Sequence, residues 1–332
     1  MNLLITGGGG FVGARLARTL LQRGELNGRA IERLVLADQV AAPADLMSNS
    51  KVDMRCGPLF EQCESLGEQR FDGIFHLASA VSGECELDFE LGLRSNLDST
   101  RALLDAVRRV GNVPRLVFSS SVAVFGPDPA VPLPATVGDD TLPMPQTSYG
   151  THKLICEHLI ADYTRKGYID GRAARLMTVT VRPGRPNGAA SSFFSGIIRE
   201  PLAGHESICP VSPDVAHPVS SPQATVDGLI AVYEASREAF LGRGALNLPA
   251  LNVTVQQMLD ALEAVAGPHV RSRVRFERDD RIAGIVANWP SAATGNRAAR
   301  LGLHPERDFA AIIRKYIDDN ASTPDALKGL HQ

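Results

Sequence analysis

Two residues with complementary acid–base chemistry stand four positions apart, in the segment Tyr149-Gly150-Thr151-His152-Lys153. On a helix, residues with this spacing share a face, so the phenol and the ammonium group can meet. A free tyrosine has a pKa of about 10 and is a poor base at neutral pH, but a neighbouring ammonium favours the phenolate and lowers that pKa. The pair is therefore suited to take a proton from a substrate hydroxyl.

Ser121 offers a third group for the same chemistry. It follows the apolar run Leu116–Phe118 and precedes Tyr149 by 28 residues. If this run is a strand of a parallel sheet, Ser121 lies at the carboxyl edge, where open α/β sheets bind their ligands. Its hydroxyl can then hydrogen-bond the substrate oxygen that loses its proton. Ser119, by contrast, is expected to satisfy nearby backbone groups.

Three glycines near the start of the chain, Gly7, Gly10 and Gly13, are spaced three apart between an apolar run and an amphipathic stretch. The first permits a tight turn, the second lets the backbone approach a pyrophosphate, and the third allows close packing of helix on strand. The following helix would present free N–H groups and the positive end of its dipole to the anion. The pattern therefore predicts a dinucleotide cofactor.

Asp38 ends the second apolar run and stands 25 residues after Gly13. A carboxylate at this position accepts hydrogen bonds from the adenosine ribose hydroxyls and repels a 2′-phosphate. No Arg or Lys follows in residues 39–41 to bind such a phosphate. We therefore expect NAD rather than NADP.

These residues need a sheet and helices to position them, and the hydrophobic pattern supplies both. The expected strands are Asn2–Thr6, Arg33–Ala37, Gly73–Ala78, Arg115–Ser119 and Thr178–Arg182, with a short one near Ala245–Leu248. The expected helices cover about 12–23, 91–109, 148–166, 224–239, 254–265 and 308–319. Short, nearly continuous apolar strands that alternate with helices predict an α/β fold with a Rossmann-type, doubly wound parallel sheet.

The second half of the chain indicates a smaller substrate-binding region. Residues 183–222 are rich in Pro, Gly and Ser, which is typical of a binding loop. We expect a cofactor domain over 1–182, to which residues 224–248 return. The substrate-binding region would comprise 183–222 and 249–320, and 321–332 would form a frayed tail.

Composition excludes several other classes. The 34 basic and 37 acidic residues nearly cancel, and aromatics make up 5% of the 332 residues, which argues against a nucleic-acid partner. No apolar run reaches the roughly 18–20 residues of a membrane helix, and the N-terminus lacks a signal-peptide pattern. Five scattered cysteines indicate reduced thiols and a cytoplasmic location. The eight histidines show no metal-ligand spacing, so no metal site is expected.

Together these motifs resemble the extended short-chain dehydrogenases/reductases of the NAD-dependent epimerase/dehydratase family. The matching pieces are Thr6-Gly7-x-x-Gly10-x-x-Gly13, Asp38, His76-Leu77-Ala78-Ser79, Asn96, Ser119–Gly126 and Tyr149-x-x-x-Lys153. The resemblance implies that Tyr149 is the proton acceptor, that Lys153 activates it and binds the nicotinamide ribose, and that Ser121 polarises the substrate. It also implies cofactor contacts at Phe11, Val12, Leu59, Ala78, Ser79, Asn96 and Pro183.

Two segments depart from the family pattern. Where the family usually has an Asp that contacts adenine, the chain reads Cys56-Gly57-Pro58-Leu59. The motif Arg-Tyr/Phe-x-Asn that usually follows the sixth strand is replaced by residues 182–187, Arg-Pro-Gly-Arg-Pro-Asn. The adenine contact and the substrate contacts are therefore expected to differ from those of many members.

Within the family, the segment Val181–Leu202 resembles the branch that oxidises a small sugar acid at C2. Val122 and Ala123 follow Ser121 where the sugar-nucleotide dehydratases carry an acidic pair. A sugar acid offers a carboxylate and several hydroxyls. An arginine can bind the carboxylate with two parallel hydrogen bonds, and Arg185 is the first candidate, with Asn187 for a hydroxyl. Arg182 and His217 are the next candidates, although each also has a plain structural interpretation.

Three functions stay open at this point: an aldonate dehydrogenase, a sugar-nucleotide epimerase or reductase, and a non-catalytic NAD-responsive binding protein. The intact set of Ser121, Tyr149 and Lys153 argues against the last. The resemblance also implies a homodimer formed by the helices expected at 91–109 and 148–166. Their apolar residues exceed what one sheet-covering face needs: Leu93, Leu97, Leu103, Leu104, Val107, Leu154, Ile155, Leu159 and Ile160.

Overall fold

The computed structural model describes residues 1–184 and 189–331. Two predicted substrate ligands, Arg185 and Asn187, therefore lie outside the described residues.

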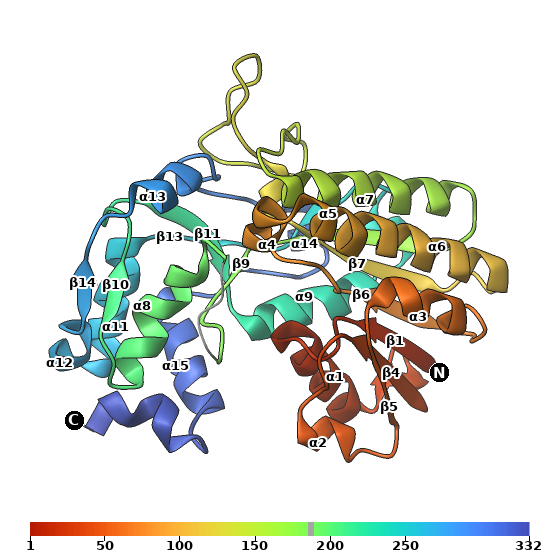
Figure 1. Cartoon of the computed structure of the whole chain (residues 1–332), viewed down its shortest axis with the longest axis horizontal. Coiled ribbons are helices and arrows are strands. Elements are labelled where there is room, and N and C mark those ends of the chain that lie inside the picture. Colours follow the sequence, from red (N-terminus) through yellow and green to blue (C-terminus); the bar gives the residue numbers. More distant parts are fainter. Residues whose placement is uncertain (185–188, 332) are drawn as a thin grey trace.

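A parallel sheet forms the centre of the larger part of the molecule (Figure 1). In the described residues it has seven strands in the order β12-β8-β7-β6-β1-β4-β5. Their bounds are β1 Asn2–Thr6, β4 Arg33–Asp38, β5 Val52–Cys56, β6 Gly73–His76, β7 Arg115–Ser121, β8 Asp170–Leu176 and β12 Leu246–Asn247. The chain starts in the middle, builds outward through β4 and β5, then crosses to β6 and builds the other way. The carboxyl ends of β1 and β6 therefore flank the switch point where such sheets bind ligands, as a doubly wound fold predicts.

Helices cover both faces of this sheet, which explains why its inner strands are almost entirely buried, whereas the edge strand β5 is half-buried. On one face, α1 Phe11–Arg23 and α9 Pro222–Glu234 pack together, with Leu16 and Leu229 in a cluster that includes Phe75 of β6. On the other face lie α3 Leu59–Leu66, α6 Ser99–Val110 and α7 Ser148–Arg165. The helix expected at 91–109 is built of α5 Phe89–Gly92, a π-helical segment Leu93–Asp98 and α6.

One predicted strand was wrong. Residues Thr178–Arg182 do not join the main sheet; Thr178–Val179 forms β9, in a separate three-stranded sheet with β11 Ala216–Ser220 and β13 Leu251–Thr254. The sixth strand of the main sheet, counted along the chain, is instead β8. Arg172 and Arg175 interrupt the apolar run of this strand in the sequence, although both side chains are buried in the structure.

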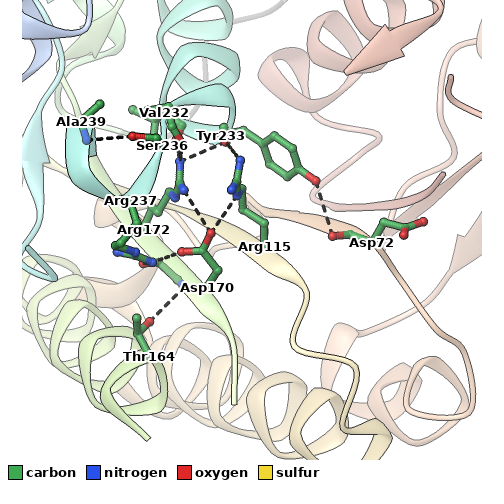
Figure 2. Close-up of polar contacts among 12 residues, drawn as sticks. Asp72, Arg115, Thr164, Asp170, Arg172, Val232, Tyr233, Ser236, Arg237 and Ala239 are labelled. Atoms are coloured by element: carbon green, nitrogen blue, oxygen red, sulfur yellow. Dashed lines mark hydrogen bonds and ion pairs between the residues drawn. The ribbon is translucent and has the colours of Figure 1, made fainter. Parts of the chain in front are cut away.

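Arg172 belongs to a polar cluster at the amino end of β8 (Figure 2). Asp170 accepts hydrogen bonds from Arg115, Arg172 and Arg237. Arg172 also donates to the carbonyl oxygens of residues 232, 233 and 235 at 2.6–3.0 Å. These carbonyls close the C-terminal end of α9, where a helix lacks donors of its own and where cations are stabilising. The cluster therefore ties α9 to the main sheet.

A second core lies beside the sheet. It is built by α8 Ser192–Leu202, α11 Val255–Ala266 and α15 Phe309–Asp319, with Phe194, Leu259 and Ile313 fully buried among them. The shorter elements are β2 Glu25–Leu26, β3 Arg29–Ala30, α2 Ala44–Met47, α4 Ser82–Leu87, β10 Ser207–Cys209, α10 Arg237–Phe240, α12 Pro268–Arg271, β14 Val274–Phe276, α13 Asp280–Val286 and α14 Asn296–Arg300.

The expectation of a frayed tail over 321–332 does not match the structure. Residues Pro324–His331 form a 3₁₀ helix that packs against α8, and Leu327 is buried in the second core. A Cβ on Gly329 would lie 2.2 Å from the carbonyl oxygen of Pro201. Leu327 and Leu330, which both contact the second core, are too few to give a recognisable period in so short a segment.

Candidate active site

A cleft of about 2320 Å³ runs between the sheet and the second core. Its walls bring together residues that the sequence places far apart. Lining it are most of the predicted cofactor and catalytic residues: Gly7, Gly10, Phe11, Val12, Gly13, Asp38, Leu59, Ala78, Ser79, Ser121, Tyr149, Lys153 and Pro183. This convergence at the carboxyl edge of the sheet makes the cleft the candidate active site.

The glycine turn has the geometry of a phosphate cradle. Gly7 has φ +74°, and a Cβ there would lie 2.8 Å from the backbone nitrogen of Ala78. A Cβ on Gly13 would lie 2.1 Å from the Gly7 carbonyl oxygen. The amide of Ala14 donates to the Gly10 carbonyl at 2.8 Å, so the amides of residues 11–13 precede the first bond within α1 and can face an anion. Larger side chains would fill this cradle, and the donors present fit a pyrophosphate.

Asp38 is held in a fixed orientation beside this turn. One carboxylate oxygen accepts from the amides of Gly9 at 3.0 Å and Gly10 at 3.2 Å, and the other accepts from the Val40 amide at 3.2 Å. Oδ2 therefore uses both of its lone pairs, whereas Oδ1 accepts one bond and keeps a lone pair for a further donor. Through Oδ1 the carboxylate can accept a ribose hydroxyl without leaving the turn.

A buried chain of hydrogen bonds fixes the floor of the cofactor region. Thr6 Oγ1 accepts from the amides of Leu77 and Ala78, both at 3.2 Å, and lies 2.6 Å from His76 Nδ1. On the far side of the imidazole, Nε2 lies 2.8 Å from Thr100 Oγ1. Burial lowers the pKa of His76 to about 3, so the ring is neutral. The whole chain is satisfied if Thr6 donates to Nδ1 and Nε2 donates to Thr100.

Asn96 completes this support from the π-helical segment. Its Oδ1 accepts from Ser79 Oγ at 3.0 Å and from the Ala80 amide at 2.7 Å, and its Nδ2 donates to the Ala80 carbonyl at 3.2 Å. Thr100 Oγ1 donates to the Asn96 carbonyl at 2.5 Å. Asn96 is buried behind Ser79 and Ala80, which line the cleft, and its hydrogen bonds hold these two residues in position. The sequence singled out His76 within a motif but gave no role to Thr6 or Thr100.

The three predicted catalytic residues come together from two elements. Ser121 ends β7, and its Oγ accepts from the Ala123 amide at 3.1 Å. Tyr149 and Lys153 lie on successive turns of α7, and Tyr149 hydrogen-bonds Ser121. Lys153 Nζ donates to the Ser119 carbonyl at 2.8 Å and lies 5.5 Å from the centre of the Tyr149 ring. Thr147 caps α7 by accepting from the Gly150 amide at 3.0 Å, which fixes where the helix begins.

The predicted lowering of the Tyr149 pKa by Lys153 was wrong for the protein alone. Burial raises the pKa of Tyr149 to about 12, and the hydrogen bond with Ser121 offsets part of this rise. Burial also lowers the pKa of Lys153 to about 8. The physical reason is desolvation, which disfavours the charged form of both groups. Positive charge added to the cleft would favour the phenolate and lower this pKa.

Two of the candidates for binding a substrate anion, His217 and Arg182, differ in their surroundings. His217 is buried, with Nε2 2.7 Å from Thr178 Oγ1 and Nδ1 3.2 Å from the Pro290 carbonyl. Burial lowers its pKa to about 4, so it is neutral and is occupied by structural contacts. Arg182 lines the cleft, with its guanidinium 4.8 Å from the centre of the Phe11 ring.

The remaining wall of the cleft falls within 249–320, where a substrate-binding region was expected, but none of its individual residues was predicted. It comes from the second core, through Arg281, Ile282 and Ile285 of α13 and the following Asn288 and Trp289. The ring of His217 stacks on Phe194 at 5.0 Å and contacts Trp289 at 5.2 Å. These residues carry no motif, and only their fold brings them to the site.

The described residues contain neither a cluster suited to a metal ion nor a helix suited to cross a membrane. Among the described residues, no group of three or more His, Cys, Asp or Glu side chains is placed to hold a metal ion. No described helix combines the length and apolar character needed to cross a membrane.

Comparisons with known proteins identify relatives of this chain. A family model described as the NAD dependent epimerase/dehydratase family matches residues 3–214. A D-erythronate dehydrogenase from Cupriavidus necator is 48% identical over 327 residues, covering 96% of this chain and 98% of that protein. One from Haemophilus influenzae is 40% identical, covering 96% of this chain and 99% of that protein.

Among solved structures, a nucleoside-diphosphate-sugar epimerase from Agrobacterium tumefaciens is 42% identical with a TM-score of 0.90, covering 97% of this chain and 95% of that one. An L-threonine 3-dehydrogenase from Trypanosoma brucei, 22% identical with a TM-score of 0.82, covers 98% and 97% and shows the shared fold.

Proposed function

The chain belongs to the NAD-dependent epimerase/dehydratase family, and we propose that it oxidises D-erythronate at C2 to 2-oxo-erythronate with NAD. The observation that carries this proposal is the meeting of Ser121, Tyr149 and Lys153 in a cleft whose other end is a phosphate cradle. Near-full-length likeness to two D-erythronate dehydrogenases supports the choice of substrate.

The residues of the cleft divide the work of the reaction. The glycine turn would hold the pyrophosphate, Asp38 the adenosine ribose and Lys153 the nicotinamide ribose. NAD, when bound, supplies the hydride acceptor and a positive charge beside the phenol. Tyr149 takes the proton of the C2 hydroxyl while Ser121 hydrogen-bonds the same oxygen, so each turnover yields a carbonyl product, NADH and a proton.

NAD is proposed in preference to NADP. Asp38 is fixed by three backbone amides at the end of β4, where a 2′-phosphate would meet a carboxylate. The cleft wall beyond it is formed by Gln39, Val40 and Pro58, without a basic residue. Pro58 immediately precedes α3, at the place where the family usually has an Asp, so adenine would contact this wall through apolar surface and Leu59.

The carboxylate of the substrate needs a cation, and Arg185, with Asn187 for a hydroxyl, remains our first candidate from the sequence. Arg182 is the second candidate, because it lines the cleft immediately before Pro183. Burial and the nearby Arg199 lower its pKa, which means that an anion beside it would be stabilising. The aromatic face of Phe11 holds its guanidinium in place.

An alternative is a sugar-nucleotide epimerase or reductase, which the name of the 42% identical Agrobacterium tumefaciens structure favours. One experiment separates the two. The purified chain is incubated with NAD and a panel of four- to six-carbon aldonates, and separately with UDP-sugars, while absorbance of the reduced nicotinamide is followed. A dehydrogenase accumulates NADH with an aldonate. An epimerase interconverts UDP-sugars without net NADH, and that result would overturn the proposal.

We also propose a cytoplasmic homodimer. All five cysteines are free thiols, and Cys56 is exposed, as suits a reducing compartment. Four of the apolar residues expected at the dimer interface are instead buried within one chain: Leu103, Leu104, Val107 and Ile160. The exposed apolar residues close to α7 are instead Leu87, Phe89 and Leu91 of the adjoining α4 and α5, together with Ile155 of α7 itself.

A further inference from the structure

A buried ion pair lies directly behind the candidate catalytic residues. Arg175 of β8 donates to both oxygens of Glu157 on α7, from Nε and from Nη2, each at 2.8 Å. Both side chains are 6% exposed. Ser120 adds a third hydrogen bond, from its Oγ to Glu157 Oε1 at 2.5 Å. Neither Glu157 nor Arg175 lines the cleft, so neither can touch a bound ligand directly.

The pair stands in register with the reacting groups. Tyr149, Lys153 and Glu157 occupy three successive turns of α7, and residues of this spacing share one face. Each of them contacts one of three consecutive serines of β7. Tyr149 bonds the Ser121 side chain, Lys153 bonds the Ser119 carbonyl, and Glu157 bonds the Ser120 side chain. Arg175 lies opposite Ser120 in the pairing of β7 with β8, so the carboxylate is gripped from two neighbouring strands.

These contacts differ in how firmly they define position. Tyr149 and Lys153 each make a single hydrogen bond to β7, and a single hydrogen bond still allows the helix to rotate relative to the strand. The Arg175–Glu157 pair is bidentate and planar, so it fixes both the rotation of α7 about its axis and its shift along the sheet. A buried ion pair is weak evidence for stability, since apolar residues of similar volume often stabilise a core equally well. Its geometric specificity is therefore the better account of its presence here.

We propose that Glu157 and Arg175 are positioning residues for the reaction: they set the register of α7 on the sheet so that Tyr149 and Lys153 meet Ser121 and the cofactor. This inference rests on the proposed function of Tyr149 as the base. A displacement of about 1 Å at a reacting group can lower a rate by roughly 100-fold, so loss of the pair should reduce kcat strongly. Binding of NAD depends mainly on the distant glycine turn and Asp38, and should change little.

The test replaces the pair with apolar residues of similar size. The triple variant Glu157→Leu, Arg175→Met, Ser120→Ala removes both charges and the hydroxyl that would otherwise lose its partner. We expect a melting temperature close to that of the wild type and an NAD Kd within about threefold. We also expect kcat about 10–100-fold lower and faster hydrogen–deuterium exchange over residues 148–157. Glu157→Gln, which keeps the shape but not the charge, should lie between this variant and the wild type in kcat.

Tyr163→Phe is the matched control. Tyr163 lies on α7, as Glu157 does, but towards the far end of the helix. The substitution removes the 2.7 Å hydrogen bond that its hydroxyl donates to Asp105 of α6. This variant should lower stability while leaving kcat and exchange over 148–157 unchanged. A triple variant with wild-type kcat and wild-type exchange would overturn the positioning role, as would an equal loss of kcat in Tyr163→Phe. If the wild type oxidises no sugar acid, the proposed function fails, and the exchange measurement still decides whether the pair sets the register.

Discussion

Lys153 Nζ lies 2.8 Å from the backbone oxygen of Ser119, while its distance to the centre of the Tyr149 ring is 5.5 Å. The strand therefore anchors the ammonium group below the phenol, and both groups sit in a desolvated pocket. In the proposed reaction, the lysine placed in this way would interact with both the ribose and the phenolate. The phenol oxygen is the one titratable atom that the proposed proton transfer requires.

Tyr149→Phe should abolish turnover and leave the fold and NAD affinity nearly unchanged. The ring stays in place on α7, and only the oxygen that bonds Ser121 is lost. Loss of a positioned general base typically lowers a rate by about 10²–10⁴-fold. Steady-state NADH formation gives the rate, and calorimetric titration with NAD gives the affinity. Near-normal turnover in this variant would exclude Tyr149 as the base.

Asp38→Ala should weaken NAD and reduce the preference for NAD over NADP. The substitution removes the acceptor for the ribose hydroxyls and the charge that repels a 2′-phosphate, and it also frees the amides of Gly9 and Gly10. The ratio of kcat/KM for the two cofactors measures the effect. Asp38→Asn is the control that keeps the size of the side chain. An unchanged ratio in both variants would mean that another group selects the cofactor.

Arg185→Ala should lower kcat/KM for the sugar acid by orders of magnitude and leave NAD affinity within a few-fold. Breaking a charge-assisted pair in a closed site typically costs about 2–5 kcal/mol. Arg185→Lys should restore only part of the activity, since lysine cannot make the planar two-bond contact. If Arg185→Ala has no effect, Arg182→Ala should show the loss instead. A normal kcat/KM in both alanine variants would rule out a carboxylate clamp at residues 182–185.

Stability should fall as the pH drops from about 6.5 towards 4, because His76 and His217 are neutral in the fold. Burial lowers their pKa values to about 3 and about 4. Below about pH 6.5 the unfolded chain binds protons that the folded chain does not, so unfolding becomes easier by at most about 1.4 kcal/mol per pH unit for each histidine. Their contribution is complete above pH 6.5. Urea unfolding measured across this range gives the slope, and a His217→Gln variant should show a shallower one.

The homodimer predicts a mass in solution of twice the 35.5 kDa chain. Light scattering at micromolar concentration measures it. Ile155→Asp places a charge on the exposed surface of α7 and should shift the equilibrium towards monomer, whereas Tyr168→Asp, a similarly exposed position beyond the end of that helix, should not. A monomeric wild type at these concentrations would contradict the proposal.

Much of the sheet and the centre of the site could be predicted, because each has a local pattern. Continuous apolar runs identified β1, β4, β6 and β7, and the glycine spacing identified the turn before α1. The strand β8 was missed because Arg172 and Arg175 interrupt its apolar run. Both are buried in the fold, where Arg172 donates to the carbonyls at the end of α9 and Arg175 donates to the carboxylate of Glu157.

The parts of the site that escaped prediction depend on contacts between distant segments. Trp289 and Arg281 reach the cleft only because α13 folds over it. Glu157 looks like an ordinary surface acid on α7 until Arg175 is known to lie beneath it. The raised pKa of Tyr149 depends on how completely the cleft excludes water, and spacing along the chain carries no information about that.

The position of α9 has a consequence for how the chain is made. This helix covers the face of the main sheet next to α1, yet it begins at Pro222, after the excursion into β9, α8 and β11. A ribosome that has released residues 1–184 has produced six of the seven described strands of the sheet, but Phe75, Val117 and Ala174 still lack their cover. This apolar face stays exposed on the nascent chain until some 50 further residues, which include α9, have been synthesised. That takes about 3–10 s at typical elongation rates. A fragment that ends at residue 184 should therefore aggregate, and the cofactor-binding half is not a module that can be transplanted by cutting the sequence at that point.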